Sequence, residues 1–483
     1  MESSKYEPVI GLEVHIQLLT KSKAYSSDST EYGAMPNTNV SVVSLGHPGT
    51  LPKVNKKNIE YAARLGLACN STIRRENEYA RKNYFYADLP KGYQITQDTT
   101  PICTGGSIKI TLKDGSEKEI GITRIHMEED SGKSIHDQDP FNTLIDLNRA
   151  GVALLEMVSE PELCSPEEAY AYLSEVRKLV RYLEICDGNM EEGSLRCDAN
   201  VSVRLKGEEA FGTKVEVKNM NSISNVQRAI EYEIERQIDE LENGHEIFQE
   251  TRSYDASTGK TFLMRTKEMA DDYRYFPEPD LPIVIVTEEF LESVKKDMPA
   301  LPNELIEKYT KEIGLSMYDA RVLTDSKAVA LYYDKLISHT SFHKTAANWV
   351  MGSVKSYLNE NGIGMKDFPL SEKRLAALID LIESGRVSHT IAVQKLFAEM
   401  IKELEKDPLQ IAEENNWIQE SDTDSILVYI EQALEKYPDK VQAYKKGNKN
   451  LLGLFMGEVM KLSKGKADPK LASQLVREHL DKK

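Results

Sequence analysis

The chain contains 483 residues, with 40% hydrophobic and 29% charged side chains and a formal net charge of −17. This composition fits a soluble, globular, intracellular protein of about two to four domains, and the negative charge argues against a general binder of polyanions. No apolar run approaches the roughly 20 residues of a membrane span, and the acidic N-terminus has no signal or transit character. We therefore expect a cytoplasmic protein that makes no membrane contact.

Periodicity in the first part of the chain predicts a mixture of strands and helices. Apolar–polar alternation predicts strands at residues 9–16, 107–112, 120–126, 199–204 and 213–218. The Lys113-Asp-Gly-Ser sequence predicts a turn between two of them. One helix is predicted to begin after the N-cap Ser165, with Pro166 in its first turn, and a second to run from about Asn221 to a Gly244 cap.

Beyond Asp280-Leu-Pro-Ile the sequence becomes almost wholly helical, and this change indicates further domains. We expect an α+β protein with a mixed α/β domain at residues 1–292. A helical domain at 293–407 and a small all-helical C-terminal domain at 408–483 follow.

The segment RKNYFYADLPKGYQ, residues 81–94, interleaves cations with aromatic side chains. That mixture suits a pocket for a nucleotide base and its phosphates, or for an RNA end. The alternative is an exposed aromatic strand with cationic flanks that turns at residues 88–92.

Carboxylates with nearby histidine offer ligands for a hard divalent cation. Glu13 and His15 alternate along a predicted strand, so both face the same side. Glu128 and Glu129 follow His126 directly after a predicted strand, where we expect the chain to turn. Other acidic pairs are Glu156 with Glu160 and Glu191 with Glu192. Oxygen ligands with an imidazole suit Mg²⁺ or Mn²⁺, although each acidic pair is also compatible with a solvated face.

A magnesium-bridged triphosphate needs cations as well as carboxylates. The candidates are Lys82, Lys91, Arg124, Lys133 and Arg196. The five cysteines are scattered without a CxxC motif, which argues against disulfides and a structural zinc site.

The C-terminal segment differs from the rest in charge. Residues 436–483 contain twelve Lys or Arg against five Asp or Glu, a net charge of +7. This basic end on an acidic body predicts a local footprint for nucleic acid. A helical tail with a solvated lysine face is the alternative.

Several motifs in order resemble the B-subunit family of the tRNA-dependent aspartyl/glutamyl amidotransferases. They are GLEVH (11–15), NTNVSVVSLGHPGTLP (37–52), RKNYFYADLPKGYQ (81–94), ITRIHMEEDSGKS (122–134), MEEGSLRCDANVSVR (190–204), VEVKNMNS (215–222), DDYRYFPEPDLP (271–282), NWVMGSV (348–354) and MGEVMKLSKGKADP (456–469). The resemblance covers nearly the whole chain.

The resemblance implies a ligase that forms carbon–nitrogen bonds with glutamine as amide donor. In this family the enzyme is a heterotrimer with a glutaminase A subunit and a small C subunit. The B subunit is implied to bind Glu-tRNA(Gln) or Asp-tRNA(Asn) and to activate the side-chain carboxylate with ATP and Mg²⁺. Ammonia from the A subunit then completes the amide.

The resemblance also implies residue roles. The metal ligands are expected to be Glu13, His15, Glu128, Glu129 and Glu156. Lys82 and Lys91 are implied to line the mouth of the same pocket, and we expect catalytic roles for both and for Glu13, His15, Glu128 and Glu129.

The remaining assignments concern nucleotide and RNA binding. We assign Arg81, Tyr84 and Tyr86 to the nucleotide or acceptor end, together with Lys133 and Arg196. The tRNA body is expected to meet Lys445, Lys446, Lys449, Lys461, Lys464 and Lys466 through phosphates, which position the RNA without reading its sequence.

One departure from the family concerns zinc. Many members carry two cysteine pairs near the N-terminus, and the aligned positions here are Ser26, Asp28, Ser41 and Ser44. Three serines and an aspartate do not replace four thiolates, so no zinc is expected.

Two rival functions remain. The first is a non-catalytic tRNA-binding assembly subunit, for which loss of Glu13 or His15 harms stability but not ATP turnover. The second is a stand-alone magnesium-dependent kinase or phosphohydrolase of a small molecule, which is active without tRNA and leaves the basic tail unexplained.

Overall fold

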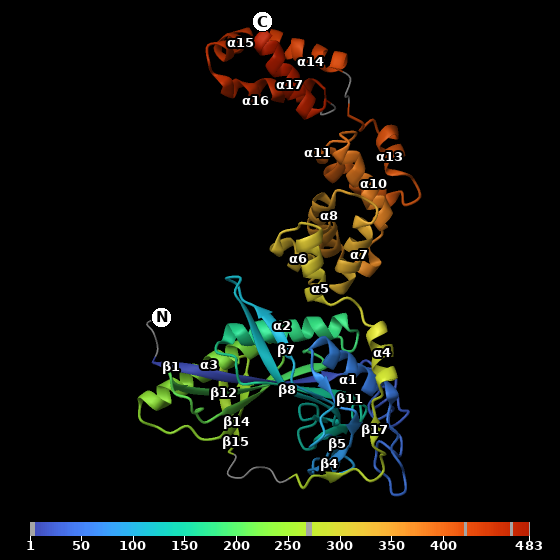
Figure 1. Cartoon of the computed structure of the whole chain (residues 1–483), viewed down its shortest axis with the longest axis vertical. Coiled ribbons are helices and arrows are strands. Elements are labelled where there is room, and N and C mark those ends of the chain that lie inside the picture. Colours follow the sequence, from blue (N-terminus) through green and yellow to red (C-terminus); the bar gives the residue numbers. More distant parts are fainter. Residues whose placement is uncertain (1–4, 267–272, 420–422, 464–466, 483) are drawn as a thin grey trace. The chain divides into compact units, whose positions relative to one another are not determined.

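The computed structural model describes residues 5–266, 273–419, 423–463 and 467–482. The chain divides into two compact units, Met1–Leu301 and Pro302–Lys483 (Figure 1). The first unit mixes strands and helices, and the described part of the second is helical. This arrangement confirms the predicted α+β class.

A ten-stranded sheet forms the first unit's framework, with the order β15-β14-β13-β12-β1-β11-β8-β6-β2 and β7 paired to β8. The strands are β1 (Tyr6–Gln17), β2 (Thr72–Ile73), β6 (Cys103–Thr104), β7 (Ser107–Thr111), β8 (Glu117–Glu129), β11 (Ala153–Ser159), β12 (Leu195–Leu205), β13 (Val215–Met220), β14 (Glu250–Asp255) and β15 (Lys260–Thr266). The predicted strands correspond to β1, β7, β8, β12 and β13. The predicted turn joins β7 to β8, where Leu112 N–H bonds Ser116 C=O at 2.9 Å.

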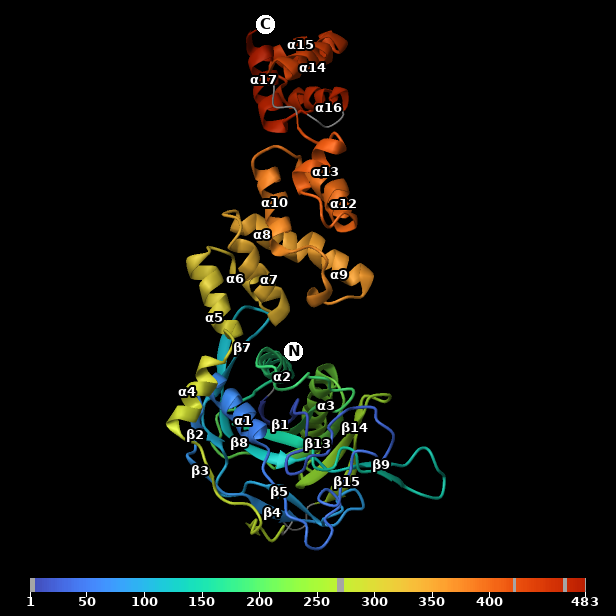
Figure 2. The same ribbon diagram turned by 90° about the vertical axis from the view of Figure 1, so that its right-hand side faces the viewer.

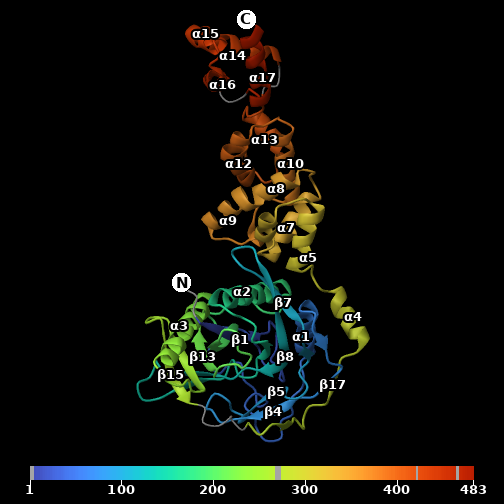
Figure 3. The same cartoon turned by 60° about the vertical axis from the view of Figure 1, so that its left-hand side comes forward.

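The two faces of this sheet differ in polarity. On β1, Leu12, Val14 and Ile16 are buried in the hydrophobic core. Helices α2 (Pro166–Tyr182) and α3 (Ile223–Glu242) cover that face (Figures 1 and 3). Because successive strand residues point to opposite faces, the residues between them line the other, polar face.

Local capping positions both helices as predicted. The Ser165 side chain accepts a bond from Glu168 N–H at 3.1 Å, and Pro166 lies in the first turn of α2. Beyond the end of α3, Gly244 has φ 78°, the left-handed conformation that glycine adopts without strain.

The first unit contains further helices at its border. Helix α1 (Lys56–Ala68), which was not among the predicted helices, also packs into the core through Tyr61, Ala62 and Leu65. Helix α4 (Glu288–Lys296) packs Leu291 and Val294 against Ala63 of α1.

Three small sheets accompany the main one. They are β16–β4–β5, β10–β9 and β17–β3, with bounds β3 (Glu76–Asn77), β4 (Ala80–Asn83), β5 (Tyr93–Thr96), β9 (Lys133–Ile135), β10 (Leu144–Asp146), β16 (Phe276–Pro277) and β17 (Val284–Ile285). The segment 81–94 is thus a hairpin of β4 and β5. Phe85 and Tyr86, which follow β4, are exposed.

The second unit consists of short helices. They are α5 (Pro302–Glu307), α6 (Met317–Leu323), α7 (Lys327–Ile337), α8 (His343–Trp349), α9 (Lys355–Asn361), α10 (Glu372–Glu383), α11 (His389–Ile391), α12 (Phe397–Lys402), α13 (Pro408–Glu414), α14 (Thr423–Lys436), α15 (Pro438–Lys445), α16 (Leu452–Leu462) and α17 (Pro469–Lys482). Single π-turns or 3₁₀-turns occur at Lys308–Glu312, Val350–Val354, Met365–Asp367, Ala392–Leu396 and Lys449–Leu451.

Helices α14 to α17 share one hydrophobic core around Phe455. The predicted boundary at 407/408 stays a prediction. Within the described ranges, no helix has the length and apolar character that crossing a membrane requires.

Candidate active site

Three neighbouring strands place one carboxylate and two imidazoles in a row across the polar face. His15 on β1 lies opposite Glu156 on β11, and Glu156 lies opposite His126 on β8. Residues paired across antiparallel strands point to the same face. Glu13 and Glu128 lie two residues from the histidines on their strands and therefore share that face.

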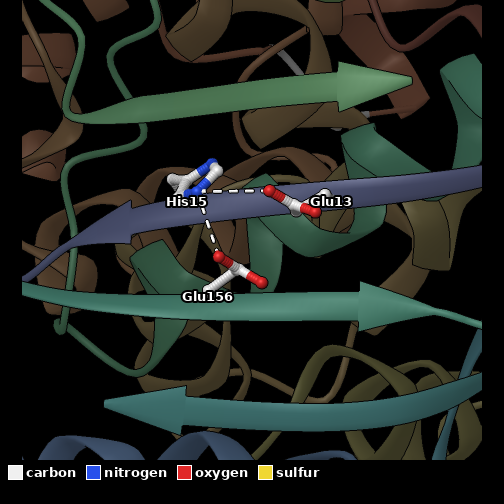
Figure 4. A group of neighbouring side chains, drawn as sticks. All are labelled: Glu13, His15 and Glu156. Carbon is white, nitrogen blue, oxygen red and sulfur yellow. Dashed lines mark ion pairs between the residues drawn. The ribbon is translucent and has the colours of Figure 1, made fainter. Parts of the chain in front are cut away.

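The side chains of this row approach one another closely. His15 Nε2 lies 3.3 Å from Glu156 Oε2 and 3.5 Å from Glu13 Oε1 (Figure 4). His126 Nε2 lies 3.1 Å from Glu128 Oε1 and 3.5 Å from Glu156 Oε1. Each imidazole therefore contacts two carboxylates, and Glu156 uses a different oxygen for each imidazole.

Strand β5 holds Glu128 in place. Thr96 Oγ1 donates to Glu128 Oε1 at 2.6 Å, and Gln94 Nε2 donates to Glu128 Oε2 at 3.1 Å. Glu128 is only 4% exposed, so these bonds compensate a buried carboxylate. The hairpin that the sequence singled out thus supports the site through Thr96 and Gln94.

Burial and mutual contact shift the pKa values of the cluster in both directions. Burial raises the pKa of Glu13, and the neighbouring Glu156 raises it further. Burial acts in the same direction on Glu156, but hydrogen bonds from His126 and His15 outweigh it and hold that pKa well below its ordinary value. Burial opposes the charge of His126, yet its bonds to Glu128 and Glu156 raise its pKa to about 10. The opposing shifts of Glu156 and His126 have one cause, the close contact between the carboxylates and the imidazoles of the row.

The donor set fits a divalent cation. Two groups, Glu13–His15–Glu156 and His126–Glu128–Glu156, each bring three possible ligand atoms within 4.8 Å of one another. Carboxylate oxygens with imidazole nitrogen suit Mg²⁺ or Mn²⁺. His126 was not among the metal ligands expected from the sequence. The His-x-Glu sequence at 126–128 has the same two residue types at the same spacing as the Glu-x-His sequence at 13–15. This similarity could have identified His126 as a candidate ligand.

Glu129 does not join the predicted ligands. The expectation that the chain turns after His126 was wrong, because β8 continues through Glu129. Alternation therefore points Glu129 away from Glu128. Glu129 Oε1 instead accepts bonds from Lys91 Nζ and, at 2.9 Å, from Ile95 N–H.

Lys91 and Glu129 line a cavity of about 190 Å³. No residue of the carboxylate–histidine cluster lines this cavity. The cavity is lined by Tyr25, Ser26, Val43, Ser44, Gly46, His47, Thr50, Pro52, Lys91, Tyr93, Ile95, Glu129, Gly151 and Asp280. The structure therefore places Lys91 with Glu129 and gives it no ion pair with the other four predicted ligands.

Two cations lie beside the cluster, Arg124, whose Nη2 is 4.0 Å from Glu156 Oε1, and Lys82. Its ammonium lies 5.0 Å from the centre of the Tyr273 ring and forms no ion pair with a residue in the described ranges. Burial opposes its charge, but Glu128 and Glu156 raise its pKa above the ordinary value. Lys82 therefore stays cationic without a close anionic partner.

Arg196 extends the row on its other side. It lies opposite His15 in the pairing of β12 with β1. Its guanidinium donates from both terminal nitrogens to Asp130 Oδ1 at 3.1 Å, while Asp130 Oδ2 has no partner among the described residues. Arg196 is thus positioned at the site by a buried carboxylate.

The other predicted nucleotide contacts are dispersed. Arg81 is held by Glu278 through two bonds of 2.6 and 2.8 Å, so its guanidinium already has an anionic partner. Tyr84 donates to Gln94 Oε1 at 3.3 Å and makes an edge contact with Tyr86.

Lys133 lies away from the row of carboxylates. It is exposed on β9, in a hairpin with β10 that extends away from the main sheet (Figure 2). The structure therefore does not bring Lys133 together with the cluster.

The four positions that align with family cysteines form a small hydrogen-bond network. Asp28 Oδ2 accepts bonds from Ser44 Oγ and, at 2.9 Å, from Ser41 N–H. Ser26 Oγ lies 3.3 Å from Ser44 Oγ. Burial would raise the pKa of Asp28, but these bonds lower it, so the carboxylate is a charged acceptor at the centre of the loop.

The predicted tRNA-binding lysines lie in the second unit. Lys445, Lys446 and Lys461 are exposed at the ends of α15 and α16. Lys449 pairs with Asp481 at 3.0 Å. Lys464 and Lys466 lie outside the described residues.

Comparison with known proteins gives matches along the chain. Residues 8–292 match the GatB/GatE catalytic domain, and residues 331–480 match the GatB domain. Proteins named as the B subunit of aspartyl/glutamyl-tRNA(Asn/Gln) amidotransferase are similar over nearly their full length. The one from Thermodesulfovibrio yellowstonii is 48% identical over 472 residues, 98% of each chain. The one from Alkalilimnicola ehrlichii is 49% identical, and one from Staphylococcus aureus is 47% identical, each over 99% of this chain and 100% of the relative.

Proposed function

Because this chain belongs to the GatB/GatE family, we propose that its polar sheet face activates the side-chain carboxylate of a misacylated tRNA for amide formation. As the B subunit of a glutamine-dependent tRNA amidotransferase, the chain is part of a multi-subunit ligase with A and C partners and tRNA substrates. The residues of the row determine which part of the reaction occurs here.

A carboxylate needs a leaving group before ammonia can displace one of its oxygens. In the proposed reaction, an oxygen of the Glu or Asp side chain on the tRNA attacks the terminal phosphorus of ATP. The bond to ADP breaks, and an acyl phosphate forms. Ammonia then attacks the acyl carbon, inorganic phosphate leaves, and the nitrogen loses a proton to give the amide.

The residues of the row position the charges that this reaction requires. Glu13, His15, Glu128 and Glu156 are proposed to hold Mg²⁺, since their oxygens and imidazole nitrogen fit that ion; the ligand atoms of Glu13, His15 and Glu156 lie within 4.8 Å of one another, and Glu128 groups with Glu156 and His126. When bound, the cation supplies positive charge to the phosphates during transfer. Thr96 and Gln94 fix Glu128 so that the site needs little reorganisation.

The observation that carries the proposal is the ammonium of Lys82 beside this buried row. Lys82 stays charged next to Glu128 and Glu156, yet it makes no close ion pair with a described residue. A cation held in this way can bind a phosphate oxygen without first breaking a salt bridge. We assign Lys82 to the transferred phosphate.

The second unit is proposed to bind the tRNA body. Lys445, Lys446 and Lys461 are exposed and carry positive charge on an otherwise acidic chain. Such lysines contact phosphates and contribute affinity without base recognition.

The test uses the heterotrimer reconstituted with its A and C partners, ATP, Mg²⁺, glutamine and misacylated tRNA. Glu156→Gln is expected to abolish amide formation and tRNA-dependent ATP hydrolysis while glutaminase activity continues. Glu160→Gln, four residues further along the chain, is the matched control and is expected to retain both activities. Normal amide formation by Glu156→Gln would refute the proposed site, and wild-type ATP hydrolysis that needs no tRNA would favour a small-molecule phosphohydrolase.

A further inference from the structure

A second pocket lies on the side of the large sheet that α2 and α3 cover, whereas the carboxylate–histidine row lies on the other face. It is lined by α2, by the loop of residues 187–191 and by residues 221–224 at the start of α3. The pocket brings together the beginning of the 190–204 motif and the end of the 215–222 motif. Its volume of about 390 Å³ is within the range of roughly 300–1,000 Å³ that small-molecule sites occupy.

Two arginines on α2 line this pocket side by side. Arg177 and Arg181 are separated by about one helical turn, so their side chains are neighbours. Both stems lie against Gly188, where a Cβ would be 2.7 Å from Arg177 Cγ and 3.3 Å from Arg181 Cδ. Neither guanidinium forms an ion pair with a residue in the described ranges. Like charges at this spacing destabilise a helix, and an anion bound between them would remove that repulsion.

The first turn of α3 supplies further donors to the same pocket. Ile223 and Ser224 line it at the N-terminus of this 20-residue helix, where the first N–H groups have no acceptor within the helix. The Ser222 side chain accepts from Asn225 N–H at 3.1 Å, so the N–H groups that precede Asn225 remain available to an anion. Backbone donors at a helix N-terminus together with arginine side chains are the groups that bind phosphate.

The acidic residues of the pocket do not neutralise the two arginines. Asp187 Oδ1 accepts from Asn189 N–H at 2.8 Å, and Asp187 Oδ2 accepts from Ser194 Oγ at 3.3 Å. Glu191 is exposed to solvent. In the part of the chain that the structure describes, neither carboxylate pairs with either arginine. The pocket therefore keeps two cationic groups for a ligand.

Tyr170 adds an aromatic surface beside the arginines. It lines the pocket, and its side chain is 40% exposed. Tyr170 precedes Arg177 by seven residues, or about two turns and about 10 Å along the helix, so both lie on the same side of α2. Aromatic side chains stack on bases, and arginines bind phosphates. Their combination in one pocket fits a nucleotide better than an isolated anion.

We propose that this pocket binds a nucleotide, with its phosphate between the two arginines and the first turn of α3 and its base against Tyr170. The nucleotide is either free or part of a bound tRNA, since both sources offer the same phosphate and base. The pocket lies across the sheet from the row, so this nucleotide is not the one whose phosphate is transferred. The inference goes beyond the proposed function and does not depend on it.

The experiment follows hydrogen–deuterium exchange of the reconstituted heterotrimer by mass spectrometry, with AMP in EDTA and, separately, with uncharged tRNA. The amides of residues 187–191 and 221–226 are expected to exchange more slowly with AMP if the ligand is a free nucleotide, and with tRNA alone if it belongs to RNA. Arg177→Gln combined with Arg181→Gln is expected to weaken this binding at least about 10-fold. Arg228→Gln, an exposed arginine further along α3, is the matched control and is expected to leave it unchanged.

Several outcomes overturn the inference. Slower exchange with neither AMP nor tRNA excludes a nucleotide here, and this wild-type result decides even if a variant fails to fold. Protection that survives the double substitution excludes the phosphate contact with the arginines. Unchanged AMP binding by Tyr170→Leu excludes the contact with the base. Glu156→Gln, which alters the row, is expected to leave the protection by AMP intact, and its loss in that variant would place AMP at the row instead.

Discussion

Removal of one hydroxyl group tests whether β5 supports the cluster as the structure indicates. Thr96 is 1% exposed, and its Oγ1 donates to Glu128 Oε1 at 2.6 Å. Thr96→Val keeps the branched shape and nearly the same volume but removes this donor. Glu128 then retains its bonds from Gln94 and His126. Its buried Oε1, however, loses one of its hydrogen-bond donors.

The expected magnitude follows from the type of bond that is lost. A hydrogen bond to a charged group contributes about 1.5–3 kcal/mol to stability. Loss of an orienting partner of a metal ligand costs about 10–100-fold in metal affinity or activity. We therefore expect Thr96→Val to weaken Mn²⁺ binding by about 10–100-fold and to lower the free energy of unfolding by up to about 3 kcal/mol.

The measurement combines Mn²⁺ titration and thermal melting of the reconstituted heterotrimer. Thr72→Val, on the exposed face of a short strand, is the matched control and is expected to change neither quantity by more than a small amount. A Thr96→Val enzyme with lower stability but unchanged Mn²⁺ affinity contradicts the orienting role, because the bond then contributes to folding alone.

Three further changes test other parts of the chain. Ser165→Ala removes the N-cap bond of α2 and is expected to lower stability by about 1 kcal/mol in chemical denaturation; no loss would show that water replaces the cap. Burial lowers the pKa of Lys23 to about 8, below the unfolded value of about 10.4. The folded state loses this proton first, so stability should rise between pH 8 and about 10.4, and Lys23→Met should flatten that rise in denaturation curves; an identical pH profile would contradict the assignment. Replacement of Lys445 and Lys446 by Ala should reduce the slope of log affinity for tRNA against log salt by roughly 1–2, and an unchanged slope would exclude phosphate contacts there.

Strand and helix signals that depend on neighbouring residues were readable from the sequence. Alternation identified β1 and β12, and the Ser165-Pro166 pair identified the start of α2. Both signals act within a few residues, because alternation and capping are local properties of the backbone. Helix α1 was missed, although its N-cap Asn55 is a residue type that favours caps.

The carboxylate–histidine cluster was only partly readable from the sequence. The sequence placed Glu13 and His15 on one face, since they lie two residues apart on one strand. It could not place Glu156 between His15 and His126, because that contact depends on the register of three strands that are distant in sequence. Family resemblance supplied the ligand list, but it did not separate Glu129 from Glu128.

The sequence by itself determined the α+β class, the family and the residue types that the reaction needs. Only the tertiary structure decided which of those residues meet. The continuation of β8 through Glu129 points that residue toward Lys91, while Glu128 and His126 face Glu156. The physical reason is that alternation fixes the face of a side chain only as far as the strand continues, whereas local sequence signals leave the ends of elements uncertain by a residue or more.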